Sequence, residues 1–180
     1  MRLVILDRDG VINHDSEDYI KSPEEWQPLP GSLEAIARLK AAGFRVVVFT
    51  NQSGLARGLF DRPTLDAIHA KMKAAVLACG GELDAIYLCP HGPGDNCSCR
   101  KPLPGMLHQI SGDLGVSLLG TPVIGDSKRD LQAARAVGAR PILVRTGNGA
   151  ATEAAGGGEG AEVVDDLAAA ADMLINETRD

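Results

Sequence analysis

Short apolar runs that alternate with helical segments constrain the fold of this chain more than any other feature. Each run is rich in β-branched residues and is followed by polar residues, which is typical of strands buried on both faces of a sheet. Strands that alternate with helices form a parallel sheet covered on both sides, so we expect a doubly wound α/β fold. The expected strands are residues 3–6, 45–49, 85–88, 122–124 and 141–144, with a further edge strand at 163–164.

The segments between these strands are expected to be helical. After the first strand, Leu33, Ile36 and Leu39 recur near helical spacing, and Gly43 favours a helix end. Residues 146–162 (TGNGAATEAAGGGEGAE) are rich in Gly and Ala and are expected to form a mobile loop. The chain has 180 residues, which suits a single domain spanning 1–180. The expected helices are 31–42, 63–78, 104–114, 131–137 and 167–175.

The composition argues against two classes of protein. The formal net charge is −6 and no basic stripe is visible, which argues against nucleic-acid binding. The N-terminal apolar run is too short for a signal sequence or a membrane span. We therefore expect a soluble, cytoplasmic protein that works as a monomer on a small molecule. Hydrophobic residues make up 44% of the chain but aromatic residues only 3%, so the core must be aliphatic.

Four acids follow two of the expected strands. Asp7 and Asp9 come after the first strand, and Asp126 and Asp130 come after the fourth. In parallel sheets, ligands bind beyond the carboxyl ends of the strands, so these acids are expected at the binding edge. Four carboxylates there would repel one another without a cation, and hard oxygen ligands suit Mg²⁺. The sequence therefore predicts a magnesium site.

A carboxylate next to Mg²⁺ can attack phosphorus and form an aspartyl phosphate. Such a reaction also needs an acid for the leaving oxygen, a donor for the phosphoryl oxygens and a cation. Asp9, Thr50 and Lys101 have the required side chains. His69 and His108 lie on expected helices and are interpreted as surface or core residues.

Four short motifs lie in order along the chain: LDRDG (6–10), FTN (49–51), RKP (100–102) and GDSKRD (125–130). Through these motifs and their order, the chain resembles the haloacid dehalogenase superfamily of phosphotransferases. The resemblance implies that Asp7 is the nucleophile and Asp9 the general acid and base, while Thr50 and Lys101 stabilise the phosphoryl group. The second acid of the first motif favours phosphate chemistry over dehalogenation.

The same resemblance implies how the metal is held and how the site is covered. Mg²⁺ would be bound by Asp7, by the backbone carbonyl of Asp9 and by Asp126, and Asp130 would orient these ligands from behind. The segments 11–49 and 52–100 have no room for a separate cap domain. Access is therefore expected to depend on short loops, notably residues 13–26 and the cysteine-rich stretch.

The stretch CPHGPGDNCSCRKP holds Cys89, His91, Cys97 and Cys99 within eleven positions. Three thiolates and one imidazole match a closed, four-coordinate zinc site, so a structural zinc ion is expected. A catalytic zinc is disfavoured because four protein ligands leave no open position. The remaining cysteine, Cys79, is expected to be a small buried residue on a helix.

The cysteine pattern combined with these motifs is similar to that of phosphatases that act on heptose bisphosphate or on histidinol phosphate. TNQSGLARGLF (50–60) and KPLPGM (101–106) favour heptose bisphosphate, a precursor for lipopolysaccharide, whereas the spacing from His91 to Cys97 equally resembles the histidinol type. Ser127 stands where some relatives of the heptose type have a lysine. The resemblance implies substrate contacts from Asp15, Tyr19, Asn51, Gln52, Ser53 and Arg100.

Two alternatives of another class remain. A phospho-accepting signalling domain also places an Asp, a Thr and a Lys at the ends of parallel strands, but Asp9 is positioned to activate water and argues against a long-lived phosphoryl group. A binding module stabilised by zinc, in which the acids have no function, is the other alternative. Magnesium binding and multiple turnover would distinguish the expected phosphatase from both.

Overall fold

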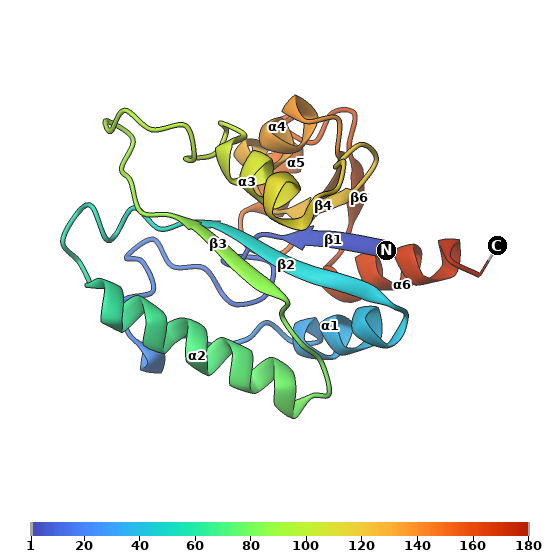
Figure 1. Ribbon diagram of the computed structural model, residues 1–180, viewed down its shortest axis with the longest axis horizontal. Coiled ribbons are helices and arrows are strands. Elements are labelled where there is room, and N and C mark those ends of the chain that lie inside the picture. Colours follow the sequence, from blue (N-terminus) through green and yellow to red (C-terminus); the bar gives the residue numbers. More distant parts are fainter. Residues whose placement is uncertain (1, 180) are drawn as a thin grey trace.

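The sheet of the computed structural model, which describes residues 2–179, is parallel throughout and follows the order β3-β2-β1-β4-β5-β6 (Figure 1). The chain starts in the middle of the sheet, winds out to one edge, and returns to build the other half. This arrangement confirms the doubly wound fold, including the edge strand. The strands are β1 (Arg2–Leu6), β2 (Phe44–Asn51), β3 (Ala85–Cys89), β4 (Pro122–Gly125), β5 (Arg140–Val144) and β6 (Glu162–Val164).

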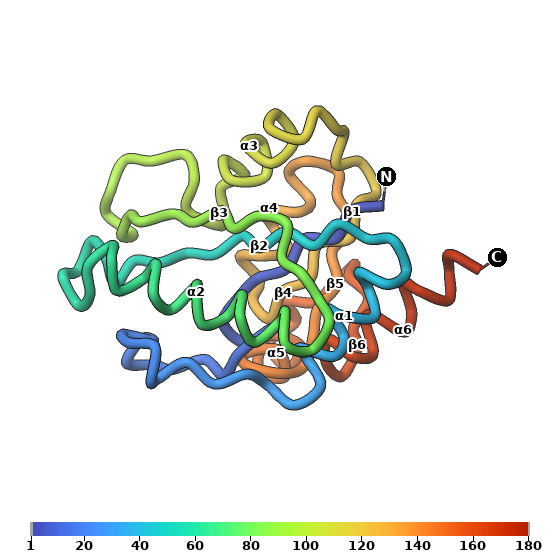
Figure 2. The backbone as a smooth tube through the Cα atoms, turned by 60° about the horizontal axis from the view of Figure 1, so that its bottom comes forward, coloured from blue at the N-terminus to red at the C-terminus, as the bar shows by residue number. Residues whose placement is uncertain are grey.

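Helices cover both faces of the sheet (Figures 1 and 2). Helices α1, α2 and α6 pack on one face, and α3 and α4 pack on the other. Within residues 2–179, no helix has the length and apolar character needed to cross a bilayer. The helical elements are η1 (Pro23–Glu25), α1 (Ser32–Ala41), α2 (Arg62–Ala78), α3 (Gly105–Leu114), α4 (Lys128–Ala136), α5 (Gly149–Ala154) and α6 (Leu167–Glu177).

The two cores are mainly aliphatic, as the composition predicts, with Trp26 and Phe44 in one and Phe49 in the other. Val4 of β1 contributes to the core beneath α1, α2 and α6, whereas its neighbour Ile5 contributes to the core beneath α3 and α4. Successive side chains of a strand point to opposite faces, so each buried strand supplies both cores. Fully burying one such side chain contributes about 1.5–3 kcal/mol, and this burial fixes the register of the central strands.

The register brings the predicted site residues together. Leu6 of β1 pairs with Val48 of β2 on one side and with Ile124 of β4 on the other. The residues that follow therefore lie side by side, with Asp7 between the ends of β2 and β4. The chain leaves β1 and β4 toward opposite halves of the sheet, and such a switch point is where doubly wound folds bind ligands.

The structure corrects three expectations. Residues 146–162 are not simply a loop, because helix α5 forms within them. Helix α4 begins at Lys128 rather than at residue 131, because Ser127 and Asp130 form a capping box that starts the helix early. Cys79 is exposed at the end of α2 and is not the buried residue expected.

Loops border the carboxyl edge of the sheet, and no separate cap domain covers it within the described range 2–179. The segment between β1 and β2 contains only a loop, η1 and α1, and the segment between β2 and β3 contains only a loop and α2. The loops after β1, β2 and β3 gather at the left of Figure 1.

Candidate active site

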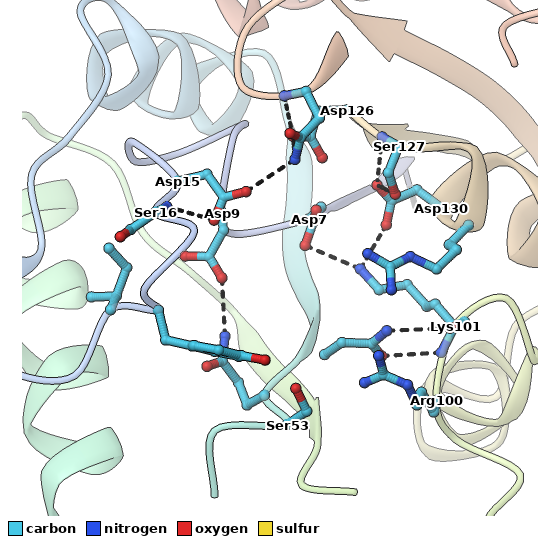
Figure 3. A pocket seen from close by; sticks show the side chains of 16 residues that line it. Asp7, Asp9, Asp15, Ser16, Ser53, Arg100, Lys101, Asp126, Ser127 and Asp130 are labelled. Atoms are coloured by element: carbon cyan, nitrogen blue, oxygen red, sulfur yellow. Dashed lines mark hydrogen bonds and ion pairs between the residues drawn. The ribbon is translucent and has the colours of Figure 1, made fainter. Parts of the chain in front are cut away.

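A cavity of about 220 Å³ opens at the carboxyl edge of the sheet (Figure 3). It gathers every residue predicted to be catalytic, to bind substrate or to hold magnesium, except Thr50. The side chains come from the ends of β1, β2 and β4, from the start of α4, and from the loops after β1, β2, β3 and β5. The lining residues are Asp7, Asp9, Asp15, Ser16, Tyr19, Ile20, Asn51, Gln52, Ser53, Arg100, Lys101, Asp126, Ser127, Arg129, Asp130 and Asn148.

Lys101 links two of the acids. Its side chain is 4% exposed, and Nζ lies 3.0 Å from Oδ1 of Asp7 and 2.6 Å from Oδ1 of Asp130. Nζ also donates to the carbonyl oxygen of Phe49 at 3.2 Å and lies 4.1 Å from the centroid of that ring. These contacts hold the ammonium group in one place, beside the oxygen of the predicted nucleophile.

Burial controls the electrostatics of these groups. Burial, followed by the negative charge of Asp130, raises the pKa of Asp7 well above its ordinary value. Burial also raises the pKa of Asp126 to about 7. For Lys101, burial opposes the charged form, but the carboxylates of Asp130 and Asp7 outweigh it and raise the pKa. One lysine does not balance these carboxyl groups, so the site favours an added cation.

The acids fit a magnesium ion. Oxygens of Asp7, Asp126 and Asp130 lie within 4.8 Å of one another. Oδ1 of Asp130 accepts from the lysine, and Oδ2 accepts from the backbone N–H and the hydroxyl of Ser127 at 3.1 and 2.9 Å. Asp130 thus lies behind the other two, while carboxylate oxygens of the kind that Mg²⁺ prefers face the cavity. Gly147, with φ +56°, packs so closely that a Cβ there would lie 2.3 Å from Oδ2 of Asp126.

The carboxylate of Asp9 is held by hydrogen bonds on both oxygens. Oδ1 accepts from Nε of Arg8 at 2.9 Å, from Nη2 of Arg8 at 2.8 Å and from Nδ2 of Asn13 at 2.9 Å. Oδ2 accepts from Nε2 of Gln52 at 3.1 Å. The metal contact predicted for Asp9 involves its backbone carbonyl, which these bonds leave untouched. No pattern in the sequence indicated the contributions of Arg8 and Asn13.

The two residues that end β2 have hydrogen bonds that were not foreseen. Thr50 is fully buried and lies outside the cavity, where its Oγ1 accepts from Nε2 of Gln52 at 2.9 Å. Its contact with a phosphoryl group stays a prediction. Asn51 holds the backbone of Lys101, because its Oδ1 accepts the lysine N–H at 3.0 Å and its Nδ2 donates to the lysine carbonyl at 3.3 Å. Asn51 therefore positions the lysine as well as lining the cavity.

The four predicted zinc ligands come together beside this site. The Sγ of Cys89 lies 2.8 Å from that of Cys99 and 3.9 Å from that of Cys97, and Nδ1 of His91 lies 3.3 Å from the Sγ of Cys99. None of these cysteines forms a disulfide within the described chain. Burial raises the pKa of the Cys89 thiol to about 12, so a thiolate there needs a cation. Three sulfurs and one imidazole nitrogen fit a closed zinc site.

The cysteine loop, residues 89–102, joins the zinc ligands to the cavity. Gly105 anchors its far end by donating its N–H to the carbonyl oxygen of Ser98 at 2.9 Å. Only glycine fits there, because a Cβ would lie 2.2 Å from that oxygen. Arg100 donates from Nη1 to the carbonyl oxygen of His91 at 3.4 Å and lines the cavity together with Lys101. The loop thus presents two cations directly after its last cysteine.

Several lining residues were not predicted as contacts, and Asn148 is the most consequential. Its backbone N–H donates to Oδ2 of Asp126 at 2.8 Å, and its Nδ2 donates to Oδ2 of Asp15 at 3.0 Å. Asn148 lies in the segment expected to be mobile, so the composition of that segment concealed it. Arg129 lies within the GDSKRD motif, which was the signal that could have identified it. The other three are Ser16, Ile20 and Ser127.

Two family models match the chain. The model described as polynucleotide kinase 3 phosphatase matches residues 2–121, and the model described as HAD-hydrolase-like matches residues 98–170. Both descriptions name hydrolases, and between them the matched segments contain all four motifs on which the expected activity rests.

Proteins of similar length match along nearly the whole chain. The D-glycero-beta-D-manno-heptose-1,7-bisphosphate 7-phosphatase of Bordetella bronchiseptica is 60% identical over 178 residues, which covers 98% of this chain and 99% of the relative. The protein of the same name from Pseudomonas aeruginosa is 56% identical over 173 residues, covering 96% and 97%. The crystal structure of D,D-heptose 1,7-bisphosphate phosphatase from B. bronchiseptica, complexed with magnesium and phosphate, has a TM-score of 0.96 at 60% identity and covers 98% of this chain and 99% of that one.

Proposed function

The chain belongs to the D-glycero-beta-D-manno-heptose-1,7-bisphosphate 7-phosphatase family of haloacid dehalogenase-like hydrolases, and we propose that it hydrolyses the 7-phosphate of this bisphosphate. The single observation that carries the proposal is the placement of Asp7. It lines the cavity with Nζ of Lys101 at 3.0 Å from its Oδ1, next to Asp126. A carboxylate held between a fixed cation and a second acid is suited to phosphoryl transfer.

Asp7 is the nucleophile in the proposed mechanism. Its Oδ1 accepts from Nζ of Lys101 at 3.0 Å and from the backbone N–H of Arg8 at 2.8 Å, which prevents rotation of the carboxylate. An oxygen of Asp7 attacks phosphorus, and the bond between phosphorus and the C7 oxygen breaks. Asp9 gives its proton to the leaving C7 oxygen. Asp9 then takes a proton from water, which attacks phosphorus and releases phosphate and free Asp7.

Magnesium is the proposed catalytic cofactor, held by Asp7, by the backbone carbonyl of Asp9 and by Asp126, with Asp130 orienting them. When bound, it supplies positive charge next to the phosphoryl oxygens. The structure of the B. bronchiseptica relative contains magnesium and phosphate, which supports the assignment. The clustering of three carboxyl groups and the raised pKa values of Asp7 and Asp126 are the support from this chain.

The sugar and its second phosphate would contact residues around the rim of the cavity. Asp15 and Tyr19 approach from the loop after β1, and Gln52 and Ser53 approach from the loop after β2. Arg100 offers a guanidinium, which binds a phosphate or a hydroxyl in a fixed geometry. These residues are proposed substrate contacts, together with Asn51 and with Thr50 as a donor to the phosphoryl group. The names of the relatives support the beta anomer.

Zinc is the proposed structural metal, held by Cys89, His91, Cys97 and Cys99. Its role would be to order the cysteine loop, which has few apolar residues to pack. Ordering the loop places Arg100 and Lys101 at the cavity, so the metal would act on catalysis indirectly.

The same proposal includes the setting of the enzyme. The chain would act as a single domain spanning 1–180, as a monomer in the cytoplasm, and would supply heptose for lipopolysaccharide. Its partner would be a phosphorylated sugar rather than a nucleic acid or a membrane.

Phosphate release in the presence of Mg²⁺ tests the proposal. The substrates are both anomers of the heptose 1,7-bisphosphate and histidinol phosphate, and kcat/KM is expected to be highest for the beta anomer. Asp7→Asn should abolish turnover and leave the fold intact, whereas Asp66→Asn removes an equal charge from the surface of α2 and should have no effect. Unchanged turnover in Asp7→Asn refutes the mechanism. A higher kcat/KM for histidinol phosphate supports the alternative substrate, and a stable phosphoprotein without turnover supports a signalling domain.

A further inference from the structure

His69 is a buried histidine that the proposed mechanism does not use. It lies on α2 one turn after Leu65, on the stripe that faces the core, and is 7% exposed. Apolar residues are expected on such a stripe, and its neighbours Ile68 and Met72 are fully buried. A polar ring in this position needs a hydrogen-bond partner, and its partner comes from the active site.

That partner is Arg8, the residue between the two acids of the first motif. Arg8 is 1% exposed, and its Nη1 lies 3.1 Å from Nε2 of His69. A guanidinium only donates hydrogen bonds, so Nε2 of His69 must be the acceptor and the ring proton must be on Nδ1. Burial, followed by the positive charge of Arg8, lowers the pKa of His69 to about 4. The ring is therefore neutral at pH 7 and able to accept.

The other side of the guanidinium holds Asp9. Nε and Nη2 of Arg8 both donate to Oδ1 of Asp9, at 2.9 and 2.8 Å. Asn13 donates to the same oxygen, whereas Oδ2 accepts only the longer bond of 3.1 Å from Gln52. The two oxygens of Asp9 are therefore not equivalent, and Oδ1 is the one fixed by charge.

We propose that His69 is a positioning residue for proton transfer, because it fixes Arg8, which in turn fixes Oδ1 of Asp9 and leaves Oδ2 to exchange the proton. The inference rests on the proposed function, since it assigns the atom of Asp9 that protonates the leaving oxygen and then receives the proton of water. The chain of contacts runs from His69 on α2 through Arg8 to Asp9, which lies in the cavity (Figure 3). A displacement of about 1 Å at a reacting group can reduce a rate a hundredfold, so a support behind Asp9 affects the chemical step.

The test compares steady-state kinetics of two variants at position 69 and one control. His69→Phe keeps the ring volume but removes the acceptor, and it should lower kcat about tenfold to a hundredfold. Such a loss is smaller than that expected from removing general acid and base catalysis altogether, which accelerates reactions by about a hundredfold to ten-thousandfold. KM should stay within about twofold, because Asp9 acts on the reacting atoms rather than on ground-state binding. His69→Gln restores an acceptor and should recover most of kcat. His108→Phe alters an exposed histidine on α3 and should behave as the unaltered enzyme.

Each outcome bears on the proposal. A kcat that is lowered in His69→Phe but close to that of the unaltered enzyme in His69→Gln supports the proposal. The Tm is recorded for all variants. A lower Tm with unchanged kcat means that His69 only packs, and this overturns the proposal, as does a rise in KM at constant kcat. If His69→Phe fails to fold, His69→Leu is measured in its place, under the same criteria. Turnover by the unaltered enzyme and its loss in Asp7→Asn establish the function separately, so a failure of this inference is distinguishable from a failure of the function.

Discussion

Replacing Lys101 by methionine removes the one cation that lies between Asp7 and Asp130 in the described structure. Methionine has a similar length and packs against the same surroundings, but it has no charge. Two buried carboxyl groups then lose the cation that they share, although each keeps its backbone hydrogen bond. We expect a large loss in the free energy of unfolding at pH 7, measured without Mg²⁺.

The distances set the size of the effect. At an effective dielectric constant of about 20, unit charges 3.0 Å apart attract by about 5.5 kcal/mol, and charges 2.6 Å apart attract by about 6.4 kcal/mol. Desolvation offsets most of this attraction in the folded enzyme, and removing one partner of a buried pair typically costs about 3–5 kcal/mol. A carboxyl group can escape by taking up a proton, which costs about 4 kcal/mol at pH 7 relative to an ordinary pKa of about 3.9. We therefore expect a loss of about 4 kcal/mol.

The pH dependence distinguishes this cause from a packing defect. When folding raises the pKa of a carboxyl group, the free energy of unfolding falls as the pH increases from the pKa of the unfolded state toward the pKa of the folded state. The penalty of Lys101→Met should therefore shrink by about 1.4 kcal/mol for each pH unit below 7, to about 1.2 kcal/mol at pH 5. A cavity left by a smaller side chain would cost the same at both pH values.

Urea unfolding followed by the fluorescence of Trp26 provides the assay. Trp26 is the only tryptophan of the chain and is 1% exposed, so its emission reports loss of the core. Lys73→Met on the exposed side of α2 is the matched control and should leave the stability unchanged. A penalty below about 1 kcal/mol at pH 7, or one that is equal at pH 5 and pH 7, would refute the reasoning, because a buried charge pair costs about 3–5 kcal/mol to break.

Two further predictions concern the metals. Burial raises the pKa of Asp126 to about 7, so Mg²⁺ must displace a proton from this carboxyl group when it binds below that pH. The dissociation constant of Mg²⁺, measured by calorimetry, should therefore rise about tenfold from pH 8 to pH 6. A dissociation constant that does not change with pH would contradict the assignment of Asp126 as a ligand. Cys99→Ser should lose zinc, which mass spectrometry measures. Its Tm and activity should fall because Arg100 and Lys101 directly follow this ligand. Cys79→Ser is the control, since it alters an exposed cysteine outside the cluster and should leave the zinc content, the Tm and the activity unchanged. Zinc loss with unchanged activity and Tm would mean that the zinc ion does not position Arg100 and Lys101.

The sequence by itself determined the fold class and the edge of the sheet at which the site lies. Both follow from local patterns, because a β-branched run buried on both faces predicts a parallel strand wherever it occurs. The acids after the first and fourth expected strands then had to meet, since the carboxyl ends of parallel strands share one edge. The ligands of the proposed zinc ion were visible for the same reason, as they lie within eleven residues of one another.

Only the tertiary structure decided how these groups are held. Lys101 lies 94 positions from Asp7, and His69 lies 61 positions from Arg8, so no local spacing indicates either contact. Helix α5 and Asn148 were hidden within a segment whose Gly and Ala content suggested disorder, because their order comes from hydrogen bonds to Asp126. Side-chain directions and long-range packing fix such contacts, and a one-dimensional pattern does not contain them.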